Sequence, residues 1–273
     1  MTTLRETQDA AVVDVGSNSV RLVVYRIDGR AMTPILNEKV MAGLGRDLAR
    51  TGALSKDGVD VALRALRRFA TLLEAQGVSS VFPVATAAVR EAKDGRAFAR
   101  RIKEEIGFDL RILDGGEEAK LSALGVSGGA PDAKGLVGDL GGASLELVEI
   151  APSGVGRGET FPLGPLTLAN EEGFDYGRVT AAVERVLKDA RALSKRGGDF
   201  YAVGGAWRAL GRINIALSNH PIGVLHHHEM NRADVLKLAD VCASRAGARS
   251  SVSKRPPPSE RKRCPMRRSC SNA

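Results

Sequence analysis

DVGSNSVR, at residues 14–21, is the stretch of sequence that decides the fold of this chain. Apolar runs at 11–13 and 20–27 flank it, and two predicted strands separated by so few residues indicate a β-hairpin. The turn holds one carboxylate, a glycine and small polar side chains, which leave backbone N–H groups accessible. Successive free N–H groups form a concavity that binds phosphate oxygens, and Asp14 beside them can hold a divalent cation directly or through water. The same residue types also build ordinary turns, so this stretch alone predicts only a hairpin.

The same arrangement is repeated in the second half of the chain. Residues 135–138 and 145–150 are predicted strands, and DLGGAS at 139–144 is the small-residue turn between them. The shared pattern is an aspartate, a glycine two residues later and a serine at the sixth position. Its repetition predicts two related domains that face each other across a cleft, each with one phosphate loop.

The remaining segments alternate between strands and helices. Predicted strands cover 31–42, 80–85, 110–113 and 200–203, and predicted helices cover 55–76, 86–92, 94–106, 115–126 and 176–196. This alternation predicts an α/β fold. We place an N-terminal domain at 10–126, a C-terminal domain at 135–244 and a disordered tail at 245–273. The tail is polar, basic and rich in proline, and such a segment cannot bury enough surface to fold.

The net charge of +8 belongs to this tail. Residues 245–273 contain nine Lys or Arg and one Glu, so the rest of the chain is neutral. We therefore expect no nucleic-acid partner, and an aromatic content of 4% argues against a platform for stacking bases. No apolar run is long enough for a membrane span, and residues 1–10 lack an apolar signal core. These features predict a cytoplasmic protein without membrane contact.

Six segments together resemble the exopolyphosphatase and guanosine-pentaphosphate phosphatase (Ppx/GppA) family, and they come in family order. They are DVGSNSVR at 14–21, ATAAVREAKDG at 85–95, DGGEEAKLSALGV at 114–126, DLGGASLEL at 139–147, FPLGPL at 161–166 and VGGAWRAL at 203–210. The resemblance implies the fold of the actin, Hsp70 and sugar-kinase superfamily, which is two ribonuclease-H-like domains around a cleft. It also implies release of the terminal phosphate from inorganic polyphosphate or pppGpp, with Mg²⁺.

The resemblance also assigns roles to particular residues. Glu118 aligns with the family's Glu-Ala motif and would orient the attacking water. The residues that would hold the metal are Asp14, Asp139 and Glu146. Arg21 and Arg90 would neutralise the anionic substrate. The residues expected to bind phosphate are Gly16, Ser17, Asn18, Ser19, Gly141, Gly142, Ser144, Gly204 and Gly205.

Three positions leave alternatives. Glu117 is a second candidate for the base, because consecutive helical residues point about 100° apart and only one of the two glutamates can face the cleft. Ala143 stands where the family has a third glycine, and its methyl group is tolerated if φ there stays negative. The run at 226–228 looks like a metal cluster, but three adjacent histidines diverge, so we interpret it as structural.

The resemblance is expected to end near Arg245, where the family would continue with an apolar helix and the closing strand of the second domain. This predicts an incomplete second domain, with a frameshift or sequencing error as the origin of the tail. A basic arm that binds polyphosphate or nucleic acid electrostatically is the alternative.

Two other functions fit the paired phosphate loops. One is an ATP-dependent kinase of the same superfamily, and the other is a non-catalytic binder of polyphosphate or pppGpp. The choice between polyphosphate and pppGpp stays open, because both present a terminal phosphoanhydride to the same loops. The oligomeric state also stays open, with a homodimer among the options.

Overall fold

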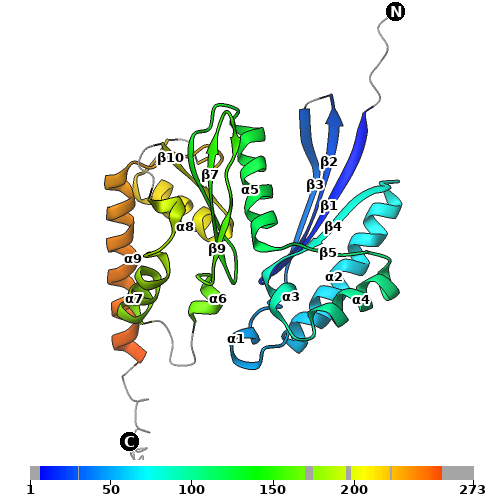
Figure 1. Ribbon diagram of the computed structural model, residues 1–273, viewed down its shortest axis with the longest axis horizontal. Helices are drawn as coiled ribbons and strands as arrows, with labels where there is room; N and C mark the ends of the chain where they lie inside the picture. The colour runs from blue at the N-terminus through cyan, green and yellow to red at the C-terminus, as the bar shows by residue number, and fades with distance from the viewer. Residues whose placement is uncertain (1–6, 30, 170–174, 195–197, 222, 254–273) are drawn as a thin grey trace, which may run out of the picture.

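A computed structural model describes residues 7–29, 31–169, 175–194, 198–221 and 223–253, with side chains up to residue 244. Two lobes lie side by side, each built on one mixed sheet (Figure 1). We call β1 to β5 with α1 to α4 the first lobe, and α5 to α9 with β6 to β10 the second lobe.

The first lobe is a five-stranded sheet in the order β3-β2-β1-β4-β5. Its strands are β1 (Gln8–Val15), β2 (Ser19–Asp28), β3 (Ala31–Met41), β4 (Ser80–Ala85) and β5 (Arg111–Ile112). The first three strands are antiparallel, while β4 pairs with β1 and β5 with β4 in parallel. Alternate residues of β1 are buried, at Ala11, Val13 and Val15, which is the period of a strand with one face on the core.

Helices α2 (Lys56–Ala75) and α4 (Gly95–Ile106) cover the face of this sheet that turns away from the second lobe (Figure 1). The short helices α1 (Leu48–Thr51) and α3 (Ala87–Glu91) lie at the end of the sheet, where α1 contacts the second lobe. Helix α2 buries Leu63, Leu66, Phe69 and Leu73 at helical spacing, and these side chains join the core formed with β1 and β2. The predicted elements of this lobe are therefore confirmed, with small shifts at their ends.

The second lobe repeats the strand pattern of the first. Its strands are β6 (Gly135–Leu140), β7 (Leu145–Ala151), β8 (Gly154–Val155), β9 (Glu159–Phe161) and β10 (Asp199–Val203). The β6–β7 pair is antiparallel like β1–β2, and β10 lies parallel to β6 as β4 lies parallel to β1. In the part of the chain that the structure describes, no strand takes the place beside β10 that β5 takes beside β4. The second lobe is thus the less complete of the two.

The helices of the second lobe are α5 (Gly115–Gly129), α6 (Pro165–Leu168), α7 (Tyr176–Leu187), α8 (Gly205–Leu217) and α9 (Arg232–Ser253). Helix α5 lies between the two sheets (Figure 1) and packs on β6 and β7 through Ala119 and Ala123. The sequence division grouped this helix with the first domain, whereas its buried face belongs to the core of the second lobe. A helix belongs to the lobe whose sheet it packs against. The alternation of strands and helices along the sequence does not show which sheet that is.

Two helix ends differ from the sequence prediction. Helix α7 ends at Leu187 instead of continuing to residue 196, because the carboxylate of Glu159 accepts hydrogen bonds from the N–H groups of Arg191 and Ala192 and starts a separate 3₁₀ turn. Helix α9 runs to Ser253, into the stretch predicted to be disordered. Its continuation at 245–253 contains two alanines and two arginines, which favour helix, and no proline. The rest of the predicted tail, 254–273, lies outside the described residues.

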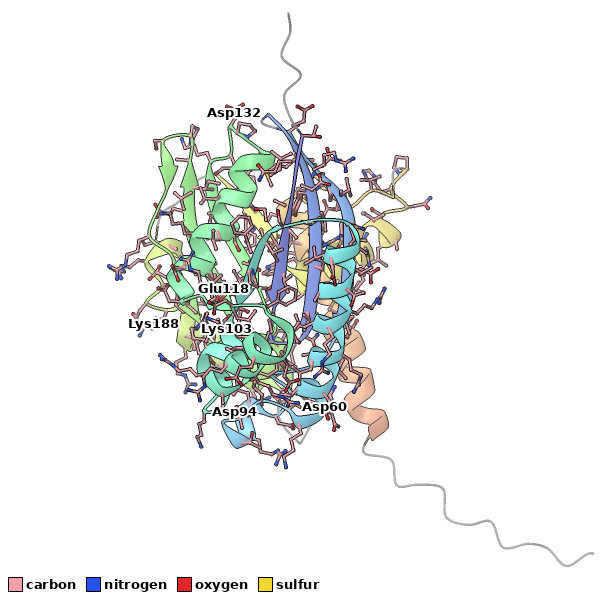
Figure 2. The ribbon with its side chains drawn as sticks, turned by 90° about the vertical axis from the view of Figure 1, so that its right-hand side faces the viewer. Asp60, Asp94, Lys103, Glu118, Asp132 and Lys188 are labelled. Atoms are coloured by element: carbon pink, nitrogen blue, oxygen red, sulfur yellow. The ribbon has the colours of Figure 1, made fainter. Side chains whose placement is uncertain are left out.

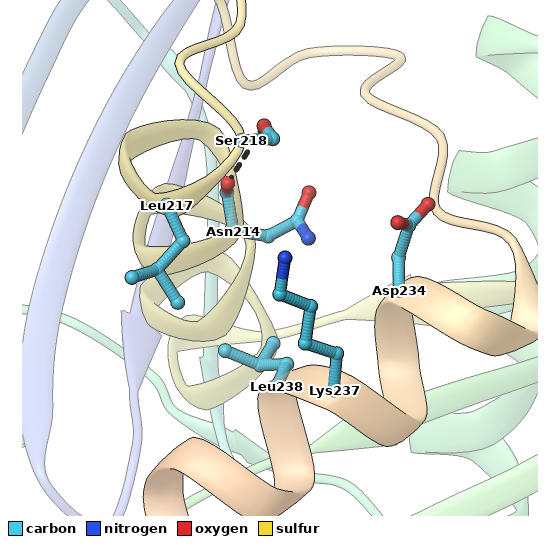
Figure 3. Close-up of a pocket in the computed structure, with 6 residues that line it drawn as sticks. All are labelled: Asn214, Leu217, Ser218, Asp234, Lys237 and Leu238. Carbon is cyan, nitrogen blue, oxygen red and sulfur yellow. Dashed lines mark hydrogen bonds between the residues drawn. The ribbon is translucent and has the colours of Figure 1, made fainter.

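Helices α8 and α9 pack against each other with a small gap at the C-terminal end of α8 (Figure 3). Asn214 and Ser218 of α8 and Asp234 and Lys237 of α9 line it, and its volume is about 30 Å³. That is room for roughly one water molecule. His228, in the predicted structural histidine run, contacts the Asn214 amide oxygen through Nε2 at 2.8 Å. None of the described helices is both long and apolar enough to cross a bilayer.

Candidate active site

The turns of the two hairpins touch each other across the lobes. A Cβ atom built on Gly142 would lie 3.0 Å from Cβ of Ser17 and 3.4 Å from Cβ of Asn18. Glycine at 142 therefore lets the second turn approach the first at van der Waals contact. The structure brings together the two small-residue turns that the repeated pattern singled out.

Each turn closes with the same backbone hydrogen bond. The N–H of Gly16 donates to the carbonyl of Ser19 at 3.0 Å, and the N–H of Gly141 donates to the carbonyl of Ser144 at 2.9 Å. These two glycines were expected to offer their N–H groups to phosphate, but both groups are used inside the turn. Among the backbone hydrogen bonds described for these turns, none is donated by the amides between the closing residues, in 17–18 and 142–143.

Ala143 fits the second turn without strain. Among the described residues, Asn219 and His227 are the non-glycine positions with positive φ, so Ala143 is outside the left-handed region. Its carbonyl accepts hydrogen bonds from the N–H of Gly164 and the hydroxyl of Thr167. The expectation that alanine is tolerated there is confirmed.

The two hairpins carry different charges at equivalent positions. Asp14 on β1 lies opposite Arg21 on β2, whereas Asp139 on β6 lies opposite Glu146 on β7. Arg21 is held by a hydrogen bond from its Nε to the amide oxygen of Asn37 at 3.0 Å. The first hairpin therefore offers one cation beside its aspartate, and the second offers two carboxylates.

Glu118, in the first turn of α5, lies at the centre of the site. Its Oε2 accepts a hydrogen bond from Nη1 of Arg90 at 3.0 Å, and both side chains are largely buried. The same nitrogen donates to the carbonyl of Leu113 at 3.0 Å. In the view of Figure 2, Glu118 lies within the outline of the molecule, whereas Asp132 lies at its upper edge. Arg90, expected to contact substrate, thus also pairs with the candidate base.

Glu117 has a separate structural task. Its N–H donates to Oδ1 of Asp114 at 2.8 Å and its own Oε2 accepts from the N–H of Asp114, which is a capping box at the start of α5. Its other oxygen pairs with Arg111 at the surface. This geometry turns Glu117 away from the site and leaves Glu118 as the glutamate that faces it.

Four carboxylates, Asp14, Glu118, Asp139 and Glu146, form what we call the carboxylate cluster. Burial raises the pKa of Asp14 to about 6, with further increases from the negative charges of Glu118 and Asp139. Burial raises the pKa of Glu146 to about 8, and the charge of Glu118 adds to this effect. The pKa values of Glu118 and Asp139 are also raised by burial, opposed by hydrogen bonds from Arg90 and Ser122 respectively.

Glu146 is the member of the cluster whose surroundings best suit binding to a cation. Its side chain is 1% exposed, and neither carboxylate oxygen has a hydrogen-bond partner among the described residues. The nearby Ser144 hydroxyl opposes the rise in the Glu146 pKa. A buried carboxylate without a partner is costly, and a divalent cation would compensate its charge.

The donor set suits a metal that also takes ligands from substrate. In the described part of the chain, no group of three or more His, Cys, Asp or Glu side chains is arranged to hold a metal ion by itself. Mg²⁺ keeps several waters and binds through one or two carboxylates plus substrate phosphates. Asp139 and Glu146, paired across β6 and β7, fit that requirement.

The glycine turn after β10 lies against the same aspartate. Gly204 has φ +110°, and a Cβ built on it would lie 2.5 Å from the carbonyl oxygen of Leu140 and 3.1 Å from Oδ1 of Asp139. A Cβ on Gly205 would meet open space, and this residue opens α8. Glycine at 204 therefore lets the turn pack closely against Leu140 and Asp139, and the open space lies at Gly205, where α8 begins.

A cavity of about 220 Å³ lies between the lobes next to the turns. Its lining residues are Gly45, Leu48, Ala49, Gly52 and Glu91 of the first lobe, with Ala143, Leu166 and Thr167 of the second. Gly45 also donates its N–H to the carbonyl of Ser17. The cavity is thus lined by Ala143 of the second turn and by Gly45, which is bonded to the first turn.

The sequence reading missed Ser122. Its hydroxyl donates a hydrogen bond to Oδ2 of Asp139. The available signal was its position four residues after Glu118, because residues at i and i+4 share one face of a helix.

Relatives of known structure have the same architecture. An exopolyphosphatase from Cytophaga hutchinsonii superposes with a TM-score of 0.75 at 25% identity, over 85% of this chain and 78% of that one. A Ppx/GppA family member from Aquifex aeolicus superposes with a TM-score of 0.70 at 24% identity, over 86% of this chain and 79% of that one. The predicted pair of ribonuclease-H-like lobes is confirmed.

Sequence comparison gives the family directly. Exopolyphosphatase 1 of Mycobacterium tuberculosis and that of Mycobacterium bovis are each 32% identical over 139 residues, which is 50% of this chain and 40% of the relative. The matched region therefore spans less than half of the length of these relatives. Residues 23–264 match the model of the Ppx/GppA phosphatase family, which extends the resemblance past Arg245, where we expected it to end. The chain belongs to the Ppx/GppA phosphatase family.

Proposed function

We propose that this chain is a phosphohydrolase that releases the terminal phosphate from inorganic polyphosphate or pppGpp, with Mg²⁺ as the metal. The observation that carries the proposal is the position of Glu118. It is a largely buried carboxylate of raised pKa that lies among the other members of the carboxylate cluster, of which Asp14 and Asp139 begin the two small-residue turns. A group that orients an attacking water is required at such a point in phosphoryl transfer to water.

In this mechanism the turns position the phosphate and Glu118 accepts the proton of the attacking water. The amides of residues 17–18 and 142–143 bind the terminal phosphoryl oxygens, and Arg21 adds positive charge from the first hairpin. Arg90 keeps Glu118 oriented through its bond at 3.0 Å, and it opposes the rise in the pKa of that carboxyl that burial causes. Proton acceptance by a positioned carboxylate contributes about 10²–10⁴-fold to rate.

Asp139 and Glu146, with Asp14 through water, would hold the divalent cation. When bound, it supplies charge neutralisation for the phosphate oxygens and the leaving group. The second hairpin has two carboxylates where the first has Asp14 and Arg21. This difference in charge favours metal binding at the second hairpin and contact between Arg21 and the phosphate at the first.

Polyphosphate is the substrate class that the named relatives favour, since the Cytophaga and Mycobacterium proteins are called exopolyphosphatases. Hydrolysis of pppGpp rests on the family description and on the shared chemistry of the terminal phosphoanhydride. A cytoplasmic location and a homodimer remain predictions from the sequence.

Phosphate release measured on purified protein tests the proposal, with polyphosphate, pppGpp and ATP compared side by side in Mg²⁺. Free phosphate from polyphosphate or pppGpp without an acceptor supports a hydrolase. Transfer of phosphate to an added acceptor with ATP as the donor would instead identify a kinase. Tight binding of polyphosphate without phosphate release would identify a binder.

A further inference from the structure

Ser122 links the helix that carries the candidate base to the candidate metal ligand. It lies one helical turn after Glu118 on α5, and its hydroxyl donates to Oδ2 of Asp139 on β6. Both ends of this hydrogen bond are partly buried, so water competes for it only weakly.

The two oxygens of Asp139 consequently have different surroundings. Oδ2 is bonded to the Ser122 hydroxyl. Oδ1 lies beside the backbone of the turn at Gly204, where a built Cβ would lie 3.1 Å from this oxygen. One oxygen is therefore fixed from α5, and the other lies beside the glycine turn at the start of α8.

We propose that Ser122 is a positioning residue: it fixes the rotation of the Asp139 carboxylate so that Oδ1 is presented to the divalent cation. This inference rests on the proposed function, because it assumes that Asp139 is a metal ligand. Groups that hydrogen-bond a ligating carboxylate fix its orientation, and losing them typically costs about 10–100-fold in metal affinity or activity. The bond also couples the Asp139 orientation to the position of α5, and so to Glu118.

Binding of Mn²⁺ alone to the full chain, followed by electron paramagnetic resonance of the free ion, tests the inference without any turnover. Ser122→Ala is expected to weaken Mn²⁺ binding about 10-fold or more. Ser122→Thr keeps a hydroxyl and is expected to restore most of the affinity. Ser127→Ala is the matched control, because Ser127 is a partly buried serine on the same helix whose hydroxyl bonds to the helix carbonyl of Ala123.

The outcomes separate this inference from the proposed function. Wild-type affinity in Ser122→Ala, together with weak binding in Asp139→Asn, would overturn the positioning role and leave the metal site intact. Wild-type affinity in Asp139→Asn, or no Mn²⁺ binding by the wild-type chain, would contradict the metal site itself and the inference with it. Equal losses in Ser122→Ala and Ser127→Ala would indicate damage to α5 and would also overturn the positioning role.

Discussion

Asp139 and Glu146 lie directly opposite each other on β6 and β7, at the place where the first hairpin pairs Asp14 with Arg21. Replacing a cation by a carboxylate at one of two equivalent positions creates a buried pair of like charges. The raised pKa of Glu146, about 8, is the electrostatic result of its burial among acidic neighbours. Such a pair can bind a cation together with substrate, and without a cation it lowers the stability of the folded state.

In the absence of metal, the raised pKa of Glu146 makes the stability of the folded protein depend on pH. Glu146 loses its proton near its ordinary pKa of 4.5 in the unfolded chain but near 8 in the folded one. As the pH rises between these values the unfolded state releases the proton first, so the folded state loses stability. We expect Glu146→Gln to lose less thermal stability than the wild type between pH 5 and pH 8, measured by melting in a chelator.

Bound metal should stabilise the wild type more than the Glu146→Gln variant. With saturating Mg²⁺ at pH 8 the wild type is expected to gain melting temperature and Glu146→Gln to gain little, since binding to the folded state stabilises it. Parallel melting curves for the two proteins at all pH values would show that Glu146 is not the titrating group.

Because the two turns are in contact, adding one methyl group at Gly142 should lower kcat/KM for polyphosphate. In Gly142→Ala the new Cβ would lie 3.0 Å from Cβ of Ser17, which forces the turns apart. We expect roughly a tenfold or larger loss of kcat/KM for polyphosphate, because small displacements of positioning groups cost about 10²-fold in enzymes. Gly125→Ala on α5 is the control, because a Cβ there meets open space. Unchanged kcat/KM in Gly142→Ala would place the phosphate site elsewhere.

The ion pair of Arg90 with Glu118 predicts a shift in the pH–rate profile. Arg90 lowers the pKa of Glu118 against the effect of burial, so Arg90→Ala should raise that pKa. A base that acts when deprotonated then needs a higher pH. The acidic limb of the pH profile of kcat/KM should therefore shift to higher pH. Arg111→Ala removes the partner of Glu117 and should leave the limb in place. If the acidic limb does not shift in Arg90→Ala, the pKa seen in the pH–rate profile does not belong to Glu118.

The two hairpins could be predicted from the sequence because small residues and an aspartate between short apolar runs specify a turn locally. The choice between Glu117 and Glu118 could not, since it depends on the capping box with Asp114. The early end of α7 depends on Glu159, far away in sequence, which accepts from two N–H groups after the break. The lobe to which α5 belongs was decided by packing on the second sheet.

The central claim is that Glu118 orients the attacking water, and phosphate release from polyphosphate by Glu118→Gln tests it most directly. Glu117→Gln is the matched control, because Glu117 caps α5 and glutamine still serves in a capping box. We predict that Glu118→Gln lowers kcat by about 10²–10⁴-fold or more with polyphosphate binding nearly unchanged, while Glu117→Gln stays close to wild type. Near wild-type turnover in Glu118→Gln, or the larger loss in Glu117→Gln, would contradict the account.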